Sequence, residues 1–424
     1  MRTPPVNLDI TTLPNNLRVV TRTMPGASSA IGAFINRGSR HENEANNGVA
    51  HFLEHMAFKG TDSRTAYDIS YQIEILGGES NACTDQCGTS YYMRGLAEHI
   101  AVGADIIGDS LNNSKYEQSD VDIESGVILQ EISQYEDDPY STMDELLMEV
   151  AFPDQPIGRK ILGTKEFVGN AKSQDFRDFI DNNYSGESMI VVAAGGVEHD
   201  AVVDVVGKAF AKVPDKVDLV PTTPATYVGG IGIDTAKKFS QVNVGLMWQS
   251  VPICDSSRYA HTLLASAFGS GGSSPLYTEI REKRGLVYHT SAHTHAEVDF
   301  GLMYIVGMLT PDNLEEFINV ACSEFAKMKE TINEDNLTRA RNSMLVRLAF
   351  MEESAMSTMN STAADLFNYG RVRSFDEIRK EINQVTVADL KTAANRIMST
   401  KPTISLVGPV PDADYEGMVK AAIG

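Results

Sequence analysis

Residues 51–61, HFLEHMAFKGT, hold two histidines and a glutamate at a spacing that can support hydrolytic chemistry. On a helix, positions i and i+4 lie one turn apart on the same face, so His51 and His55 can direct ring nitrogens at one metal ion. Glu54 borders that face and can take a proton from a water molecule without being a ligand itself. The pattern therefore indicates a zinc peptidase. The alternative is a pair of ordinary histidines on a core helix.

A catalytic zinc ion needs a third protein ligand and one open coordination position. The best candidate is Glu131, in the segment VILQEISQYED. Its neighbours Val127, Ile128 and Ile132 predict an apolar helix surface, where an unpaired carboxylate is costly unless a cation neutralises it. Glu124 lies about two helical turns earlier and faces the same way. It can hydrogen-bond a histidine ligand, or it is a solvated surface residue.

Five segments, taken together, resemble one known family of enzymes. They are HFLEHMAFKGT, the stretch beginning Asn81-Ala82, the surroundings of Glu131, FPDQPIGRKILG at 152–163 and REKRGLVY at 281–288. The family is that of the inverzincin (pitrilysin-type) zinc metallopeptidases, and the resemblance runs over nearly the whole chain. Within the family the chain looks most like the β subunit of mitochondrial processing peptidase and its bacterial homologues.

The resemblance implies a role for each residue of the pattern, with one zinc ion per chain. The implied roles are zinc ligand for His51, His55 and Glu131, catalytic base for Glu54, and support of a histidine ligand for Glu124. The complete set favours an enzyme. The competing function is that of a noncatalytic structural relative, like the core subunits of a respiratory complex, which share the fold.

The resemblance also implies how a peptide is held. The family fold is two related halves that close like a clamshell around a peptide-binding chamber. Arg281 and Tyr288 match residues that reach across this chamber to orient the peptide and stabilise the oxyanion. Without the family, they are an ordinary charged helix residue and a strand aromatic. The strand at Asn81–Ala82 matches the edge strand on which substrate pairs through main-chain hydrogen bonds.

The positions expected to recognise a basic side chain match the family pattern only in part. In eukaryotic presequence-cleaving relatives, two acidic positions after the zinc glutamate contact a substrate arginine. An ungapped alignment places Ser141 and Glu145 there, so only one of the two is acidic, and Asp144 is the nearest alternative. We expect Glu145 to favour basic residues near the cut, without a strict arginine rule.

The charge of the chain is unevenly distributed. The net charge is −21, residues 1–210 hold 32 acidic and 15 basic residues, and no Lys or Arg lies between Lys115 and Arg159. Nucleic acid is not expected as a partner, because phosphate binding needs a basic face. An acidic field attracts basic, unfolded peptides, although many acidic surfaces only maintain solubility.

The order of the expected elements predicts an α+β fold of two homologous α/β domains joined by a linker. Residues 213–230, VPDKVDLVPTTPATYVGG, combine prolines with a double glycine, as linkers do. We expect a zinc-bearing domain at 1–212 and a substrate-binding domain of related fold at 231–424. Both halves repeat the order strand, helix, loop, helix, glycine, strand.

Hydrophobic spacing places the individual elements. In the first half we expect helices at 47–58, 66–76, 96–111, 119–136 and 201–213, with extended structure at 8–22, 30–36, 81–94 and 189–194. In the second half we expect a strand at 242–248 and helices at 259–268 and 276–283. The candidate zinc residues therefore come from two helices of the first half.

The remaining features concern compartment and assembly. No run of about 18 apolar residues occurs, so no membrane span is expected. The start, MRTPPVNLDI, resembles neither a secretory signal nor a transit peptide. We expect a cytoplasmic protein of bacterial type, or a mitochondrial matrix protein if the sequence is a mature eukaryotic form. GSGGSSPLY at 269–277 lacks the long glycine-rich loop of the family's noncatalytic α subunit, which favours a homodimer.

Two groups of metal-binding residue types remain outside this pattern. Cys83 and Cys87 would lie about 13 Å apart on a strand, too far for a disulfide, so we expect reduced thiols. His289, His293 and His295 would share one face of a strand. A second metal site is possible there, but a polar face is favoured, because no acid or cysteine ligand is obvious at a matching spacing.

Overall fold

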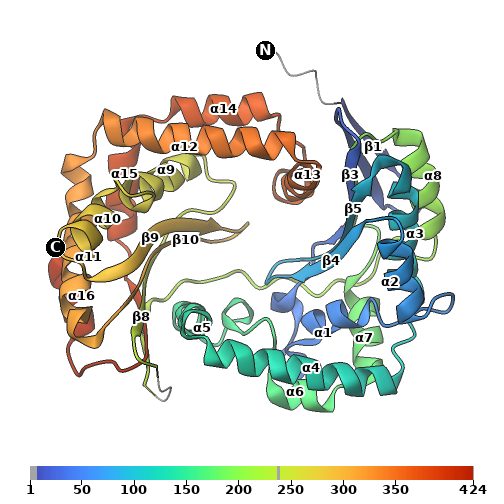
Figure 1. The fold of residues 1–424 in the computed structure, drawn as a ribbon, viewed down its shortest axis with the longest axis horizontal. Helices are drawn as coiled ribbons and strands as arrows, with labels where there is room; N and C mark the ends of the chain where they lie inside the picture. Colours follow the sequence, from blue (N-terminus) through green and yellow to red (C-terminus); the bar gives the residue numbers. More distant parts are fainter. Residues whose placement is uncertain (1–6, 236–238, 424) are drawn as a thin grey trace. The chain divides into compact units, whose positions relative to one another are not determined.

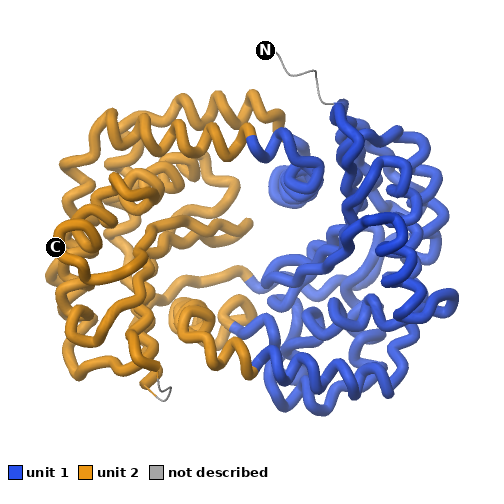
Figure 2. The backbone as a smooth tube through the Cα atoms, viewed as in Figure 1, with its two compact units in different colours: residues 1–132, 159–223, 350–372 blue, residues 133–158, 224–349, 373–424 orange. Residues whose placement is uncertain are grey.

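The computed structural model describes residues 7–235 and 239–423, which form two compact units, each a sheet packed against helices (Figure 1; Figure 2). Unit 1 comprises residues 1–132, 159–223 and 350–372; unit 2 comprises 133–158, 224–349 and 373–424. The predicted α+β class is confirmed. Each unit draws on both halves of the sequence, so the units differ from the halves 1–212 and 231–424, and those domain boundaries stay a prediction.

Unit 1 is built on a six-stranded sheet with the order β1-β2-β6-β3-β5-β4. Its strands are β1 Asn7–Thr12, β2 Arg18–Thr23, β3 Ser28–Ile35, β4 Glu79–Thr84, β5 Thr89–Leu96 and β6 Met189–Gly195. The apolar strand β6 is buried throughout and lies at the centre, parallel to β2 and antiparallel to β3. Strands β1 and β4 form the two edges of this sheet.

Unit 1 also contains helices, several of which pack against strands of the first sheet. They are α1 Val49–Met56, α2 Ala66–Glu74, α3 Ile100–Asn113, α4 Gln118–Asp137, α6 Lys165–Asn170, α7 Ser173–Asn183, α8 His199–Ala209 and α13 Ala355–Tyr369. Short 3-10 turns lie at Ser39–His41, Glu44–Asn46 and Ala97–His99. Helix α13, which comes from late in the chain, packs against β3 and β6.

Unit 2 has a five-stranded sheet with the order β7-β11-β8-β10-β9. Its strands are β7 Gly230–Asp234, β8 Val242–Gln249, β9 Val287–Ala296, β10 Gly301–Leu309 and β11 Thr403–Val407. Its helices are α5 Pro139–Ala151, α9 Arg258–Gly269, α10 Pro275–Tyr277, α11 Leu314–Thr331, α12 Glu334–Glu353, α14 Phe375–Gln384, α15 Val387–Met398 and α16 Tyr415–Ile423. Short 3-10 turns lie at Pro156–Gly158 and Pro311–Asn313.

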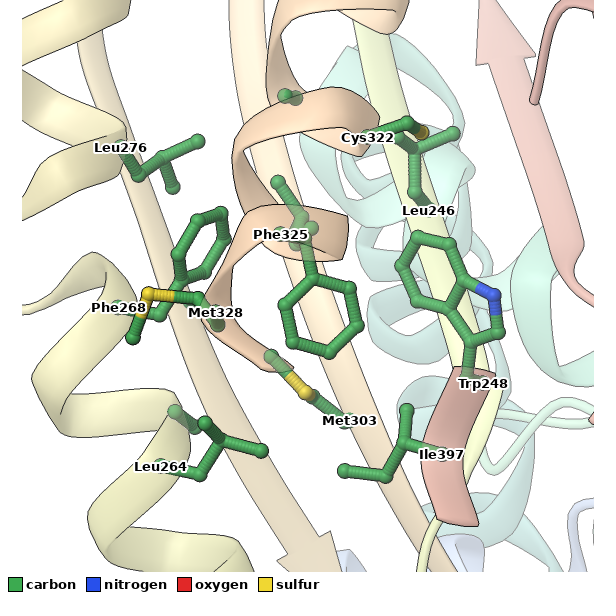
Figure 3. Packing of buried hydrophobic residues seen from close by; sticks show 14 of the residues in the cluster. Leu246, Trp248, Leu264, Phe268, Leu276, Met303, Cys322, Phe325, Met328 and Ile397 are labelled. Carbon is green, nitrogen blue, oxygen red and sulfur yellow. The ribbon is translucent and has the colours of Figure 1, made fainter. Parts of the chain in front are cut away.

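The core of unit 2 forms where helices α9, α11 and α15 cover one face of the second sheet (Figure 3). Trp248 from β8 packs on Phe325 from α11 with ring centroids 5.6 Å apart, and Phe268 from α9 lies 5.1 Å from the same ring. All three side chains are fully buried. Burial of such a side chain contributes roughly 1.5–3 kcal/mol.

Most predicted elements are present, with shifted bounds. The turn at Asn15-Asn16 separates β1 from β2, and Asn16 has a φ of 64°. The predicted helix at 276–283 is wrong in type: it is the short α10 followed by a π-helical turn at Thr278–Glu282. Residue 96 ends β5 and does not begin a helix.

Two further features concern the cysteines and the helices of the chain. All four cysteines are free thiols, as expected. Within residues 7–235 and 239–423, no helix has both the length and the apolar character needed to cross a membrane.

Candidate functional site

The helix that carries the histidines is short, and close packing constrains its position. Helix α1 begins after Gly48, which has a φ of 110°, a backbone conformation that favours glycine. A Cβ at this position would meet Gly163 Cα and Leu162 O at 2.9 Å. Phe52 packs edge-on against Phe176 of α7, with ring centroids 4.9 Å apart. One face of α1 is therefore buried in the core of unit 1.

His51 and His55 meet Glu131 of α4. His51 Nε2 lies 3.7 Å from Glu131 Oε2, and His55 Nε2 lies 3.4 Å from the same oxygen. One ligand atom from each of the three residues lies within 4.8 Å of the others, a separation that could hold a metal ion. Two imidazole nitrogens and a carboxylate oxygen form a donor set typical of catalytic zinc, so these residues fit the ion.

Glu124 lies behind His55. Glu124 Oε2 is 3.2 Å from His55 Nδ1, and its other oxygen contacts Nζ of Lys59. Glu124 is only 4% exposed, so the solvated-surface alternative is wrong. The expected apolar helix surface around Glu131 is wrong in one residue, because Val127 is 43% exposed. The buried residues of α4 are Val121, Glu124, Ile128 and Ile132.

The electrostatics favour neutral His51 and ionised Glu131. Burial lowers the pKa of His51 to about 4, against the raising effect of Glu131. The hydrogen bond with His55 holds the pKa of Glu131 below its usual range. Burial lowers the pKa of His55, but the hydrogen bonds with Glu131 and Glu124 outweigh it and raise that pKa overall. A neutral imidazole and an ionised carboxylate are the forms that bind a metal.

Glu54 lies on α1 between the histidine positions but outside the donor set. Its pKa is raised, chiefly because the carboxyl group is partly buried. Glu54 Oε2 is buried without a hydrogen-bond partner. One oxygen of this carboxylate is therefore available to exchange a proton with a reacting group.

Strand β4, the edge of the first sheet, lies against α1. It carries Asn81, which is exposed, and Ala82, which is buried. Asn81 Oδ1 accepts a hydrogen bond from the Ala82 backbone N–H at 2.9 Å. The structure thus places the predicted edge strand next to the helix that carries the histidines.

The other predicted residues belong to unit 2. Arg281 lies on the π-helical turn, pairs with Glu282, and has its guanidinium 5.3 Å from the centre of the Tyr277 ring. Tyr288, near the start of β9, is 82% exposed. Both side chains are accessible, and neither is part of the unit 2 core.

Helix α5 carries the acidic positions that follow Glu131. The hydroxyl and the backbone N–H of Ser141 both donate to Asp138 Oδ2 and cap this helix. The side chain of Ser141 is thus engaged in capping. Asp144 is exposed and Glu145 is half-buried on the same helix.

The structure does not bring the histidines of β9 together as a group of three potential ligands. Among the residues that the structure describes, His51, His55 and Glu131 are the one group of potential ligands close enough to share an ion. The ring of His293 stacks on Tyr304 at 4.8 Å, and His295 Nε2 lies 3.2 Å from Glu297 Oε1.

Two residues around the site were not predicted from the sequence. Glu42 accepts hydrogen bonds from the backbone N–H groups of Gly48 and Ala50 at the start of α1. Lys59 pairs with Glu124. The sequence indicates that a helix that follows a glycine needs an acceptor from elsewhere, but no local pattern identifies Glu42 as that acceptor.

Comparison with known proteins identifies two matching family regions. Residues 18–165 match insulinase (peptidase family M16), and residues 170–344 match the domain described as the peptidase M16 inactive domain. The first region contains all the residues of the candidate site: His51, Glu54, His55, Glu124 and Glu131.

Several curated proteins are similar along their length. An uncharacterized zinc protease of Streptomyces coelicolor is 34% identical over 95% of this chain and 90% of its own. One from Rickettsia felis is 33% identical over 95% of this chain and 98% of its own. The β subunit of the mitochondrial processing peptidase of Caenorhabditis elegans is 30% identical over 92% of this chain and 86% of its own.

Solved structures share the fold at lower identity. A Helicobacter pylori protease superposes with a TM-score of 0.88 at 19% identity, over 95% of this chain and 100% of the other. A chain of complex III from Candida albicans superposes with a TM-score of 0.86, also at 19% identity, over 98% of this chain and 100% of the other. Together with the matched regions and the curated relatives, this places the chain in peptidase family M16, whose insulinase-type members include zinc proteases.

Proposed function

We propose that this protein is a zinc-dependent endopeptidase that cleaves extended peptides or N-terminal presequences. The observation that carries the proposal is the convergence of His51, His55 and Glu131, with Glu54 on the same helix as the two histidines and outside the donor set. Three protein donors leave a position open for a reacting group, as catalytic zinc sites do and structural ones do not. The proposed stoichiometry is one zinc ion per chain.

The reaction divides the work among four residues. Zinc, when held by His51, His55 and Glu131, supplies a Lewis acid that polarises the scissile carbonyl and acidifies a water molecule at neutral pH. Glu54 would accept the proton of the attacking water and pass it to the nitrogen of the leaving amine. Its raised pKa suits this exchange, because a group that titrates closer to neutral pH both accepts and donates readily.

Substrate would bind by extending the first sheet. Strand β4 is an edge, and a peptide can add to such an edge through main-chain hydrogen bonds at Asn81 and Ala82. Arg281 and Tyr288 would orient the peptide and stabilise the oxyanion, and their exposed side chains are compatible with this role. Recognition through the main chain tolerates many sequences, which suits a peptidase of unfolded chains.

A preference for basic residues near the cut is the finer part of the proposal. The acidic excess of residues 1–210 and the stretch without Lys or Arg between Lys115 and Arg159 support it. Glu145 is the first candidate for contact with a basic side chain. Asp144 is the second, since Ser141 is committed to capping α5.

The second candidate function is that of a noncatalytic structural relative. The fold neighbour from complex III and the inactive-domain match at 170–344 favour it. The presence of the complete set His51, Glu54, His55 and Glu131 favours the enzyme.

We further propose that the protein is a homodimer. Light scattering tests this directly, and a monomer at working concentration would contradict it.

Cleavage of a library of unstructured peptides tests the proposed function. We expect cleavage that a chelator abolishes and zinc restores. The library includes matched peptides that differ only in Arg or Gln near the cut. Their cleavage by the parent protein and by Glu145→Gln, at low and high salt, measures the preference for a basic residue. Equal cleavage of both peptides at all salt concentrations overturns the preference for basic residues, and no zinc-dependent cleavage of any peptide overturns the enzyme.

A further inference from the structure

The zinc-site helix begins at a residue that has no side chain with which to cap it. Gly48 occupies the N-cap position with positive φ, and a Cβ there would collide with the backbone of Leu162 and Gly163. Ser, Thr, Asp and Asn, which usually satisfy the first N–H groups of a helix, do not fit. The free N–H groups at the start of α1 must therefore find an acceptor elsewhere in the chain.

Glu42 supplies this acceptor from outside the helix. Its Oε2 accepts from the Gly48 backbone N–H at 2.9 Å, and its Oε1 accepts from the Ala50 backbone N–H at 2.8 Å. Asn47 Nδ2 donates to Oε2 at 2.8 Å. Glu42 is 5% exposed. A buried carboxylate is stable only when donors surround it, and here they belong to the start of α1.

The same contacts tie the start of α1 to the segment 152–163 and the residue after it. Arg159 donates to the backbone carbonyl of Glu42 at 2.5 Å, and Asn47 Nδ2 donates to the carbonyl of Lys160 at 3.0 Å. The Thr164 backbone N–H donates to the Asn47 carbonyl at 3.2 Å. This segment, which has no role in the proposed chemistry, thus fixes the loop that carries Glu42.

The position of α1 matters because the helix is very short. Eight residues make about two turns, too few for a stable helix in isolation. His51 follows Ala50 directly, so a shift in the first turn of the helix moves its imidazole. A negative charge at this end also complements the helix dipole.

We propose that Glu42 is a positioning residue of the zinc centre. By accepting the N–H groups of Gly48 and Ala50, it fixes the axial rotation of α1, so that the ring nitrogens of His51 and His55 converge on Glu131. This proposal rests on the proposed zinc peptidase function. The hydrogen bonds of the Glu42 carboxylate reach Asn47 and the backbone of Gly48 and Ala50, so its proposed effect on the ligands passes through the backbone of α1.

The substitution Glu42→Gln tests the proposal at nearly constant volume. It replaces one carboxylate oxygen by an amide nitrogen, which sets a donor against a backbone N–H. Zinc affinity is measured at pH 8 by competition with a chelator, and the geometry of the centre by the visible spectrum of the Co2+-substituted protein. We expect zinc affinity to fall about tenfold, an altered spectrum, and a lower kcat with KM unchanged within about twofold.

The matched control is Asp365→Asn on α13. Asp365 is another buried carboxylate of unit 1, on the helix that packs against β3 and β6, and its charge acts on Arg22 of β2. We expect this variant to lose thermal stability while zinc affinity and the Co2+ spectrum stay those of the parent. If the control loses zinc affinity as much as Glu42→Gln does, the effect is general destabilisation and the proposal is wrong.

A second, less disruptive variant tests the proposal if Glu42→Gln does not fold. Asn47→Ala removes one donor to Glu42 and leaves both backbone hydrogen bonds, so it should lower zinc affinity by a smaller factor. If a variant that folds, Glu42→Gln or Asn47→Ala, has the zinc affinity and the Co2+ spectrum of the parent, the positioning role is wrong. Failure of the parent itself to bind zinc overturns the proposed function instead, so the two failures are distinguishable.

Discussion

The imidazole of His55 is held between two glutamates: its Nδ1 lies 3.2 Å from Glu124 Oε2, and its Nε2 lies 3.4 Å from Glu131 Oε2. Glu124 is buried and Glu131 is partly exposed, with its side chain 30% accessible. An acceptor at Nδ1 keeps the proton on that nitrogen and leaves the Nε2 lone pair for a metal. The two carboxylates therefore have different roles, although both come from α4.

The first prediction concerns Glu124→Gln. The amide is a weaker acceptor for His55 and a poorer partner for Lys59, so we expect zinc affinity to fall about 10–100-fold. Competition with a chelator measures the zinc affinity. The control is Asp122→Asn, an exposed carboxylate on the same helix, which should leave affinity unchanged. Equal affinities in both variants would show that Glu124 does not support the centre.

The second prediction concerns Glu54→Gln. The amide cannot accept the proton, so we expect kcat to fall about 10²–10⁴-fold. Zinc content should stay that of the parent, because Glu54 is outside the donor set. His51→Ala is the contrasting variant and should lose both zinc and activity. Substantial peptide cleavage by the Glu54→Gln variant would show that Glu54 is not the catalytic base.

The third prediction follows from the burial of Glu42. Burial raises the pKa of this carboxyl from 4.5 to about 7, although the hydrogen bonds from Asn47, Ala50 and Gly48 and the charge of Arg159 lower it. The folded protein therefore holds this proton more tightly than the unfolded chain does. The stabilising contribution of Glu42 is complete below pH 4.5 and is lost as the pH rises through about 7.

Urea unfolding of chelator-treated protein at a series of pH values checks this window. The free energy of unfolding of the parent, minus that of Glu42→Gln, should fall by about 3 kcal/mol from pH 4.5 to pH 8. Subtraction of the variant removes the titration of all other groups that the two proteins share. Parallel curves for the two proteins would mean that the pKa of Glu42 is not raised in the folded state.

The fourth prediction concerns Arg281→Ala and Tyr288→Phe. Both residues belong to unit 2 and are proposed to act on the peptide, so we expect lower kcat/KM with zinc content unchanged. The loss for Tyr288→Phe should be about 10²-fold or more if its hydroxyl stabilises the oxyanion. Lys283→Ala, an exposed neighbour of Arg281, serves as the control. Parental cleavage by both variants would contradict their proposed role.

Much of the site was predictable because its residues follow local rules. The i, i+4 spacing of His51 and His55 and the position of Glu131 among apolar residues are visible in the sequence. The structure adds what spacing alone does not contain. Lys59 reaches Glu124 through a contact between α4 and the turn after α1, and Glu42 caps α1 from a loop that passes residue 159.

The fold shows the same division between local and distant effects. Strands such as β6 follow from apolar runs, and their bounds differ from the expectation by only a residue or so. The placement of residues 350–372 in unit 1 follows from packing of α13 on β3 and β6, which no local pattern reports. The π-helical turn at Thr278–Glu282 has the same spacing of apolar residues as an α-helix and was therefore predicted as one.

The measurement that tests the central claim most directly is the zinc content of the purified protein, taken together with its peptidase activity. Elemental analysis should find one zinc ion per chain. Removal of the metal by a chelator should abolish cleavage of an unstructured peptide, and stoichiometric zinc should restore it. Protein that holds no zinc and still cleaves the peptide at the parental rate would contradict the claim that His51, His55 and Glu131 form a catalytic zinc centre.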